Sequence, residues 1–262
     1  MLNFVDRKFN SEQTSKYRLS IQISLDGFLF CIFDTNNICL AAKTLNTADA
    51  GIDYLFATEL LLTKRFSSVK CIAVSQKSTL VPNGCFDKNK SAEYLEFVCD
   101  INNEKIFTHK IQKADAHCIF AIDNDIYATV KKYQPQAEFY NQCIPLIYSA
   151  LRSSGKNMFI FFDSETIDIV ACDSENLLLQ NSYKTESTGD AIYFVAAVKK
   201  ILNVEFDNIY LSGKINKHEE EEFGSFFEKV KVKVEMNKNL MFATGTENSL
   251  RLTLLEKLNR CV

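Results

Sequence analysis

The feature that most constrains the fold is an internal repeat, in which residues 158–214 resemble residues 19–77. Both segments contain a polar turn, at 34–38 and 173–177, and a tyrosine, Tyr54 and Tyr193. After a short gap, both end in Ser-X-Lys, within 74–77 and 211–214. Two segments rich in Ile, Phe and Leu can look alike by chance, but the matched turns favour a duplication. The chain is therefore expected to contain two similar structural units.

Each copy predicts the element order β-β-β-α-β. Two apolar runs flank a short polar turn, which is Asp26-Gly27 in the first copy and 163–165 in the second. Asp-Gly between apolar runs is a strong hairpin signal, because both central positions of a tight turn need positive φ. A third strand follows, and apolar residues at helical spacing begin near Ala50 or Gly189. This order predicts mixed sheets with helical cover, which is an α/β fold.

The segments outside the two repeat copies predict where the lobes begin and end. The polar run at 153–156 marks the boundary, so we expect an N-terminal lobe over 1–154 and a C-terminal lobe over 155–262. Residues 1–16 are polar and predict a mobile arm or an early edge element. Further expectations in the first lobe are a turn at 79–84, a helix at 88–99 with Ala92, Leu95 and Val98 inward, and a helix at 126–133 capped by Asp123.

Composition excludes several classes of protein. The formal net charge is −3 and no basic cluster occurs, which makes nucleic acid a poor partner. No apolar run approaches 18 residues and the start lacks an apolar leader, so we expect a cytoplasmic protein without direct membrane insertion. Nine cysteines, an odd number, argue against a disulfide framework.

Three short motifs support a resemblance to a known family: the hairpin Ser24-Leu25-Asp26-Gly27, the segment Leu80-Val81-Pro82-Asn83, and Ile209-Tyr210-Leu211-Ser212-Gly213-Lys214. With the repeat, the chain resembles an uncharacterised bacterial family, catalogued as a domain of unknown function, with the actin-like ATPase fold. The resemblance covers nearly the whole chain. It implies two ribonuclease H-like lobes related by a pseudo-dyad, with a cleft between them.

Enzymes of the actin-like class bind ATP and Mg²⁺ through two hairpins and a Gly-rich turn, so the resemblance also implies where a nucleotide would lie. Here Phe28 follows Gly27 directly, and the second hairpin lacks glycine and adds Glu165. We therefore predict a degenerate nucleotide site with no catalytic residue and no cofactor. The candidate binding residues in the cleft are Asp26, Gly27, Lys77, Asp163, Ser212, Gly213 and Lys214.

Other chemistry has little support in the sequence. The three histidines, His109, His117 and His218, have no Cys or His at zinc spacing, so no metal site is expected. No P-loop, nucleophile elbow or Rossmann fingerprint occurs. Cys85 and Cys143 are expected to be the less buried thiols, and nothing marks either as a nucleophile.

Two functions remain from this reasoning. The first is a non-catalytic binding, assembly or adaptor protein that acts on a protein partner or by self-association. The alternative is an active Mg-ATP-dependent ATPase or small-molecule kinase. That alternative requires Asp26, Asp163, Lys77 and Lys214 to gather around a nucleotide, since ligands of α/β proteins bind at the carboxyl ends of strands.

Overall fold

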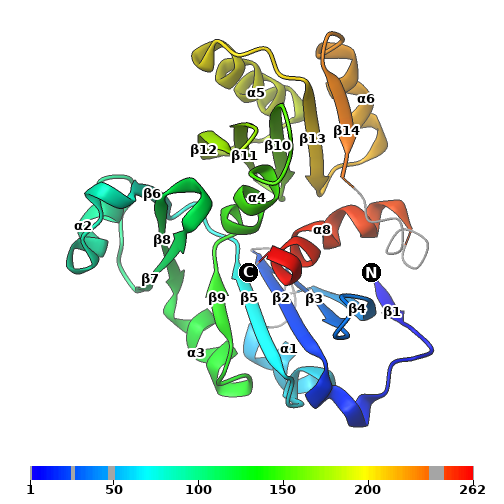
Figure 1. Ribbon diagram of the computed structural model, residues 1–262. Coiled ribbons are helices and arrows are strands. Elements are labelled where there is room, and N and C mark those ends of the chain that lie inside the picture. Colours follow the sequence, from blue (N-terminus) through cyan, green and yellow to red (C-terminus); the bar gives the residue numbers. More distant parts are fainter. Residues whose placement is uncertain (1, 25–26, 47–50, 236–244, 262) are drawn as a thin grey trace. The chain divides into compact units, whose positions relative to one another are not determined.

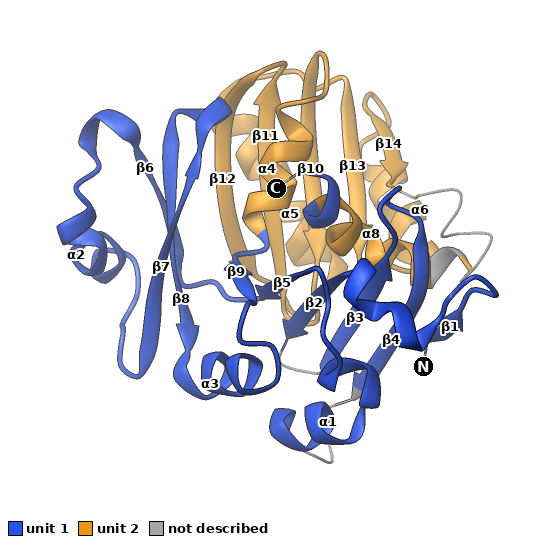
Figure 2. Cartoon of the chain, turned by 60° about the horizontal axis from the view of Figure 1, so that its bottom comes forward, with its two compact units in different colours: residues 1–142, 258–260, 262 blue, residues 143–257, 261 orange. Residues whose placement is uncertain are grey.

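The computed structural model describes residues 2–24, 27–46, 51–235 and 245–261. The chain forms two compact units (Figure 2). Unit 1 comprises residues 1–142 and 258–260, and unit 2 comprises residues 143–257. The division falls after residue 142, whereas the sequence analysis places it after 154. Helix α4 (Cys143–Ala150) accounts for the difference, because it packs on strands of unit 2.

Unit 1 is built on a six-stranded mixed sheet (Figure 1). The strand order is β1-β4-β3-β2-β5-β9, in which β2, β5 and β9 are parallel and the other neighbours are antiparallel. The strands are β1 (Asn3–Val5), β2 (Arg18–Ser24), β3 (Gly27–Phe33), β4 (Cys39–Asn46), β5 (Ser68–Ala73) and β9 (Glu138–Tyr140). Because β1 pairs along the outer side of β4, the N-terminal segment is an edge element rather than a mobile arm.

Aromatic packing joins the helices of unit 1 to its sheet. The helical segments that follow β4 and β8 are α1 (Ile52–Thr58), the 3₁₀ turn η2 (Leu60–Thr63) and α3 (Asn124–Tyr133). The ring of Phe28 on β3 stacks on Phe56 of α1 at 5.3 Å, and Phe56 stacks on Tyr133 of α3 at 5.6 Å. The predicted cap of α3 is confirmed, because Asp123 Oδ1 accepts the backbone N–H of Asp125 at 2.8 Å.

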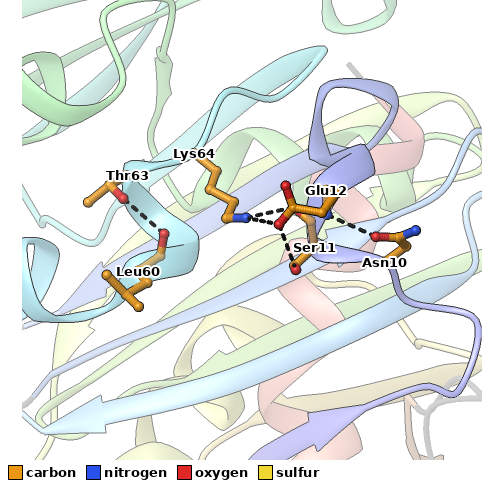
Figure 3. Close-up of polar contacts among 6 residues, drawn as sticks. All are labelled: Asn10, Ser11, Glu12, Leu60, Thr63 and Lys64. Carbon is orange, nitrogen blue, oxygen red and sulfur yellow. Dashed lines mark hydrogen bonds and ion pairs between the residues drawn. The ribbon is translucent and has the colours of Figure 1, made fainter.

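A polar contact fixes the segment between β1 and β2 (Figure 3). This segment contains the 3₁₀ helix η1 (Ser11–Lys16). Lys64, just after η2, donates to the Ser11 carbonyl at 2.9 Å and pairs with the Glu12 carboxylate at 3.0 Å. Hydrogen bonding to Lys64 lowers the pKa of Glu12.

Between β5 and α3, unit 1 carries an insertion with a sheet of its own, in the order β6-β8-β7. Its elements are β6 (Ser78–Pro82), η3 (Asn83–Cys85), η4 (Lys88–Lys90), α2 (Ser91–Glu96), β7 (Glu104–Ile111), η5 (Gln112–Ala114) and β8 (Ala116–Asp123). Leu95 of α2 is fully buried against Val81 and Ile119. The turn expected at 79–84 is wrong for 79–82, which pair with β8, whereas 83–84 lie in the 3₁₀ turn η3. Ala92 and Val98, expected inward, are exposed.

Unit 2 is built on a five-stranded mixed sheet in the order β12-β11-β10-β13-β14. Its elements are β10 (Lys156–Phe162), β11 (Thr166–Asp173), β12 (Asn176–Lys184), α5 (Thr188–Leu202), β13 (Asn208–Gly213), α6 (Lys217–Phe226), β14 (Lys231–Val234) and, together with α4, α8 (Thr246–Cys261) except for its residues 258–260, which belong to unit 1. Met158 and Ile160 of β10 face the core under α5 and α6, with Val195 and Phe223. Phe159, on the alternate face, lies under Lys257 of α8.

The two large sheets share one topology. In each, three antiparallel strands are followed by a helix and a parallel strand, as the sequence predicts. The end of the predicted repeat alignment, which matched Lys77 with Lys214, is wrong. At the end of β5 the Val74 N–H donates to the Ile23 carbonyl, and at the end of β13 the Lys214 N–H makes the equivalent bond to the Phe162 carbonyl, both at 2.8 Å. Lys214 therefore occupies the place of Val74 and not that of Lys77.

Candidate functional site

The candidate site of unit 2 lies where β10 and β13 end. These strands are parallel neighbours, so their carboxyl ends meet at one edge of the sheet. Gly213 has φ +92° and approaches β10 so closely that a Cβ atom would lie 2.1 Å from the Phe162 carbonyl oxygen. Glycine is therefore required for the contact that places Lys214 beside the second hairpin.

An ion pair occupies this edge. Lys214 Nζ lies 2.8 Å from Asp163 Oδ1 and donates to Ser164 Oγ at 2.7 Å. The Asp163 side chain is only 8% exposed and the Lys214 side chain 21% exposed. The lysine thus compensates a nearly buried carboxylate of its own unit, which would otherwise be costly to desolvate.

Ser212 does not face a ligand at this edge. Its side chain is buried and its hydroxyl donates to the Ile160 carbonyl oxygen at 3.3 Å, within the sheet. Of the three candidates at the end of β13, only Lys214 therefore presents a side-chain polar group to the hairpin.

A small cavity adjoins the ion pair. Its volume is about 160 Å³, and it is lined by Asp163, Ser164 and Lys214, by the start of α5 and by Glu219 of α6. Asp163, Glu186 and Glu219 carry negative charge against one lysine, which gives 1 − 3 = −2. A polyphosphate is disfavoured here unless a cation accompanies it.

The N-terminus of α5 is already capped. Ser187 Oγ accepts the Asp190 N–H at 3.2 Å, and Asp190 Oδ2 accepts the N–H groups of Glu186 and Ser187 at 2.9 and 3.0 Å. The backbone hydrogen bond from Glu186 and the Ser187 hydroxyl lower the pKa of Asp190. Three N–H groups at this helix end, those of Glu186, Ser187 and Asp190, are therefore bonded within the capping turn itself.

The candidate residues of unit 1 have separate roles. Lys77 follows β5 in the loop before β6, and its ammonium forms a short ion pair with Glu104 of β7. Hydrogen bonding to Lys77 lowers the pKa of Glu104. Gly27 is buried at the start of β3, where its carbonyl accepts from the Ser24 hydroxyl at 3.2 Å. Asp26 lies outside the described residues.

Phe28, which directly follows Gly27, is a core residue of unit 1. Its ring is 3% exposed and stacks on Phe56 of α1.

Four side chains that contact the candidate lysines or cap the adjoining helix were not predicted from the sequence: Glu104, Ser164, Ser187 and Asp190. The Ser-X-X-Asp pattern at 187–190 is a capping-box signal and could have identified the last two. No local signal predicts the pairing of Lys77 with Glu104, since the contact depends on how β6 and β8 place β7.

Histidine and cysteine side chains have structural roles. The His117 ring stacks on Phe86 at 3.7 Å, and its Nε2 lies 3.1 Å from Asn83 Oδ1. Burial lowers the pKa of both His109 and His117. Burial also raises the pKa of the Cys71 thiol.

The two thiols named from the sequence differ in exposure. Cys85 is exposed as expected, whereas Cys143 is buried in α4, contrary to the prediction. Within the described residues, no three His, Cys, Asp or Glu side chains are grouped to hold a metal. No described helix has the length and apolar character that spanning a membrane demands.

The comparisons with known proteins define the fold class. A Bacteroides thetaiotaomicron protein with actin-like ATPase fold and unknown function matches with a TM-score of 0.82 at 24% identity, over 97% of this chain and 99% of that one. The chain therefore has the actin-like fold. It belongs to the family described as "Protein of unknown function (DUF3822)", whose model matches residues 6–255.

More distant structures share the fold. The cytoplasmic domain of EpsL, an inner membrane component of the type II secretion system of Vibrio cholerae, matches with a TM-score of 0.57 at 11% identity, over 94% of this chain and 96% of that one. A chain of the PilM-PilN type IV pilus biogenesis complex matches with a TM-score of 0.58 at 10% identity, over 92% and 97%. The search of curated proteins finds no match.

Proposed function

We propose that this protein is a non-catalytic actin-like protein that acts by binding another protein or a second copy of itself. The observation that carries the proposal is the use of both candidate lysines within their own units. Lys214 is held by Asp163 and Ser164, and Lys77 by Glu104. A lysine in such a pair must give up its partner before it can bind a phosphate, which costs binding free energy.

The cavity beside the first of these pairs also supports the proposal. At about 160 Å³ it is smaller than the roughly 300–1,000 Å³ typical of small-molecule sites. Its charge of −2 repels a polyphosphate, and the N–H groups of Glu186, Ser187 and Asp190 are bonded within the cap of α5. In this proposal, the charged groups at this edge of unit 2 stabilise the fold and do not form a phosphate-binding site.

The structural neighbours point to assembly. EpsL is a component of a secretion system and PilM-PilN is a complex for pilus biogenesis. A scaffold of this class can therefore serve as a part of a larger machine, and we extend that role to this chain as the proposal.

The alternative, an active Mg-ATP-dependent ATPase or small-molecule kinase, has one observation in its favour. Asp163, Ser164 and Lys214 still line a cavity at the carboxyl ends of β10 and β13, where such enzymes place ligand groups. It would require Asp26, Asp163, Lys77 and Lys214 to act on one Mg²⁺-bound nucleotide.

ATP hydrolysis by the purified chain tests the proposal. We expect release of phosphate from Mg-ATP no faster than in protein-free buffer, for the natural sequence and for Asp26→Ala and Asp163→Ala. Turnover by the natural sequence that is lost in either variant would contradict the proposal and establish the alternative.

A further inference from the structure

One surface feature outside the site is an apolar turn at the tip of the insertion in unit 1. Phe97 is 86% exposed and Val98 58% exposed at the end of α2. The turn is anchored, because the N–H groups of Val98 and Cys99 both donate to the Leu95 carbonyl at 2.9 Å, and Leu95 is fully buried. We call residues 93–100 the knob.

The knob is acidic as well as apolar. Glu93, Glu96 and Asp100 are exposed around Phe97, and residues 93–100 contain no basic residue. An anchored, exposed aromatic ring with charges of one sign around it has the composition of an interface anchor, in which an aromatic centre is surrounded by a polar rim.

A second feature is a groove in unit 2, where α5 and α6 end side by side. Its volume is about 470 Å³. Val204, Phe227 and Val230 provide apolar walls, and Phe226, which is 60% exposed, stands at its side. We call this cavity the α5–α6 groove.

Basic residues exceed acidic ones around the groove. Lys199, Lys200 and Lys229 are among its lining residues, against Glu205 and Glu228, which gives 3 − 2 = +1. Lys199 pairs with Glu205 at 2.7 Å. Lys200 and Lys229 are exposed and offer ammonium groups to an acidic partner.

We propose that the knob of one molecule docks in the α5–α6 groove of a second copy. Phe97 would enter between Phe226 and the apolar walls, and the carboxylates beside it would face Lys200 and Lys229. A cavity of about 470 Å³ lies in the range that accommodates a small ligand, so it has room for the aromatic ring. The contact rests on the proposed function, of which it names the partner.

The contact would join two different surfaces. It is therefore heterologous: after pairing, one molecule keeps an unused groove and the other keeps an unused knob. Association continues head to tail until a ring closes or a filament forms. Because one turn and one groove make the contact, we place it among the small, weak interfaces and expect assembly only at micromolar or higher protein concentration.

Sedimentation from micromolar to millimolar concentration provides the first test. We expect the mass of the natural chain to rise with concentration beyond a dimer. Phe97→Ser, which removes the knob, and Lys200→Glu/Lys229→Glu, which reverses the groove charge, should each weaken association about thirtyfold or more, as loss of a hot spot does. Tyr54→Ser and Tyr193→Ser remove exposed rings outside both surfaces and should change nothing.

Mixing the two variants provides the decisive test. Phe97→Ser keeps an intact groove and Lys200→Glu/Lys229→Glu keeps an intact knob, so the mixture should form a 1:1 dimer that neither variant forms alone, and grow no further. Unfolding curves that match the natural chain would exclude misfolding of either variant.

The outcomes separate this contact from the function on which it rests. A chain that stays monomeric at millimolar concentration, a Phe97→Ser variant that assembles normally, or a mixture that remains monomeric would overturn the contact. None of these results bears on ATP hydrolysis, so turnover that depends on Asp26 or Asp163 would contradict the proposed function whatever the outcome for the contact.

Discussion

At the scale of residues, the carboxyl edge of β10 and β13 depends on one pair of charges. Asp163 is nearly buried, and Lys214 is the cation that faces it. Removal of one member of such a pair leaves the other desolvated without compensation, and this costs more than the pair itself contributes.

Lys214→Met should therefore lower the free energy of unfolding by about 2 kcal/mol, less than for a fully buried pair because Lys214 is partly exposed. The double variant Lys214→Met/Asp163→Leu should recover most of the loss, because no unpaired charge remains. Urea unfolding measures both. A double variant as unstable as the single one would show that the pair is not the cause.

Gly213 sets the spacing between β13 and β10. In Gly213→Ala, the new methyl group would meet the Phe162 carbonyl at 2.1 Å in a left-handed conformation, so we expect a loss of roughly 3 kcal/mol in unfolding free energy. Gly224→Ala is the matched control in the same unit, because nothing lies within 4 Å of its Cβ and it is inside helix α6. That variant should be neutral or slightly more stable.

Two histidines of the insertion make stability depend on pH. Burial lowers the pKa of His109 and His117 in the folded chain, so the unfolded chain binds more protons below the ordinary histidine pKa of about 6.5. Stability is fully present above that value and is lost as pH falls through the lowered pKa.

Urea unfolding at pH values from neutral to mildly acidic measures this loss. His109→Gln/His117→Gln should reduce the slope of stability against pH in this range. His218→Gln replaces an exposed histidine of unit 2 and serves as the control. If the slope of unfolding free energy against pH is unchanged in the double variant, the pH dependence comes from other groups.

At the scale of elements, α5 owes its start to a reciprocal cap. Ser187 and Asp190 each accept a backbone N–H of the other. Ser187→Ala should lower the free energy of unfolding by about 1 kcal/mol, as loss of an N-cap does. Ser225→Ala, on the exposed side of α6, should change it by less than about 0.5 kcal/mol. Equal losses in chemical unfolding would show that the cap of α5 contributes nothing particular.

Elements with local causes could be predicted from the sequence. Asp123 was expected to cap α3, and does so because its side chain satisfies donors two and three residues away. Strand β6 was missed because Pro82-Asn83-Gly84 signals a turn, while the pairing that makes 78–82 a strand comes from β8, which is distant in sequence. Local patterns report local hydrogen bonds, and strand pairing between distant segments leaves a weaker signal.

The candidate site shows the same limit. The hairpin acid Asp163 and the strand-end lysine Lys214 could be selected from the sequence, since both follow apolar strands. Their contact could not, because it depends on the register of β10 with β13. The Ser-X-Lys match gave a wrong alignment for the same reason. The sequences align Lys77 with Lys214, whereas the hydrogen bonds of the two sheets place Val74 at the position equivalent to Lys214.

At the scale of the whole molecule, the chain has the actin-like fold, and its two large sheets share one strand order. The described candidate side chains with charge are engaged in pairs within their own units. We therefore expect these charged groups to stabilise the fold rather than to bind a nucleotide.

Thermal unfolding with and without millimolar Mg-ATP measures whether the paired groups still bind a nucleotide. A nucleotide at 100 times its Kd would add about 2.7 kcal/mol of stability, which is several degrees for a chain of this size. We expect no shift in Tm for the natural sequence or for Asp163→Ala. A saturable rise in Tm of the natural sequence that disappears in Asp163→Ala would contradict the proposal of a non-catalytic protein with a degenerate nucleotide site.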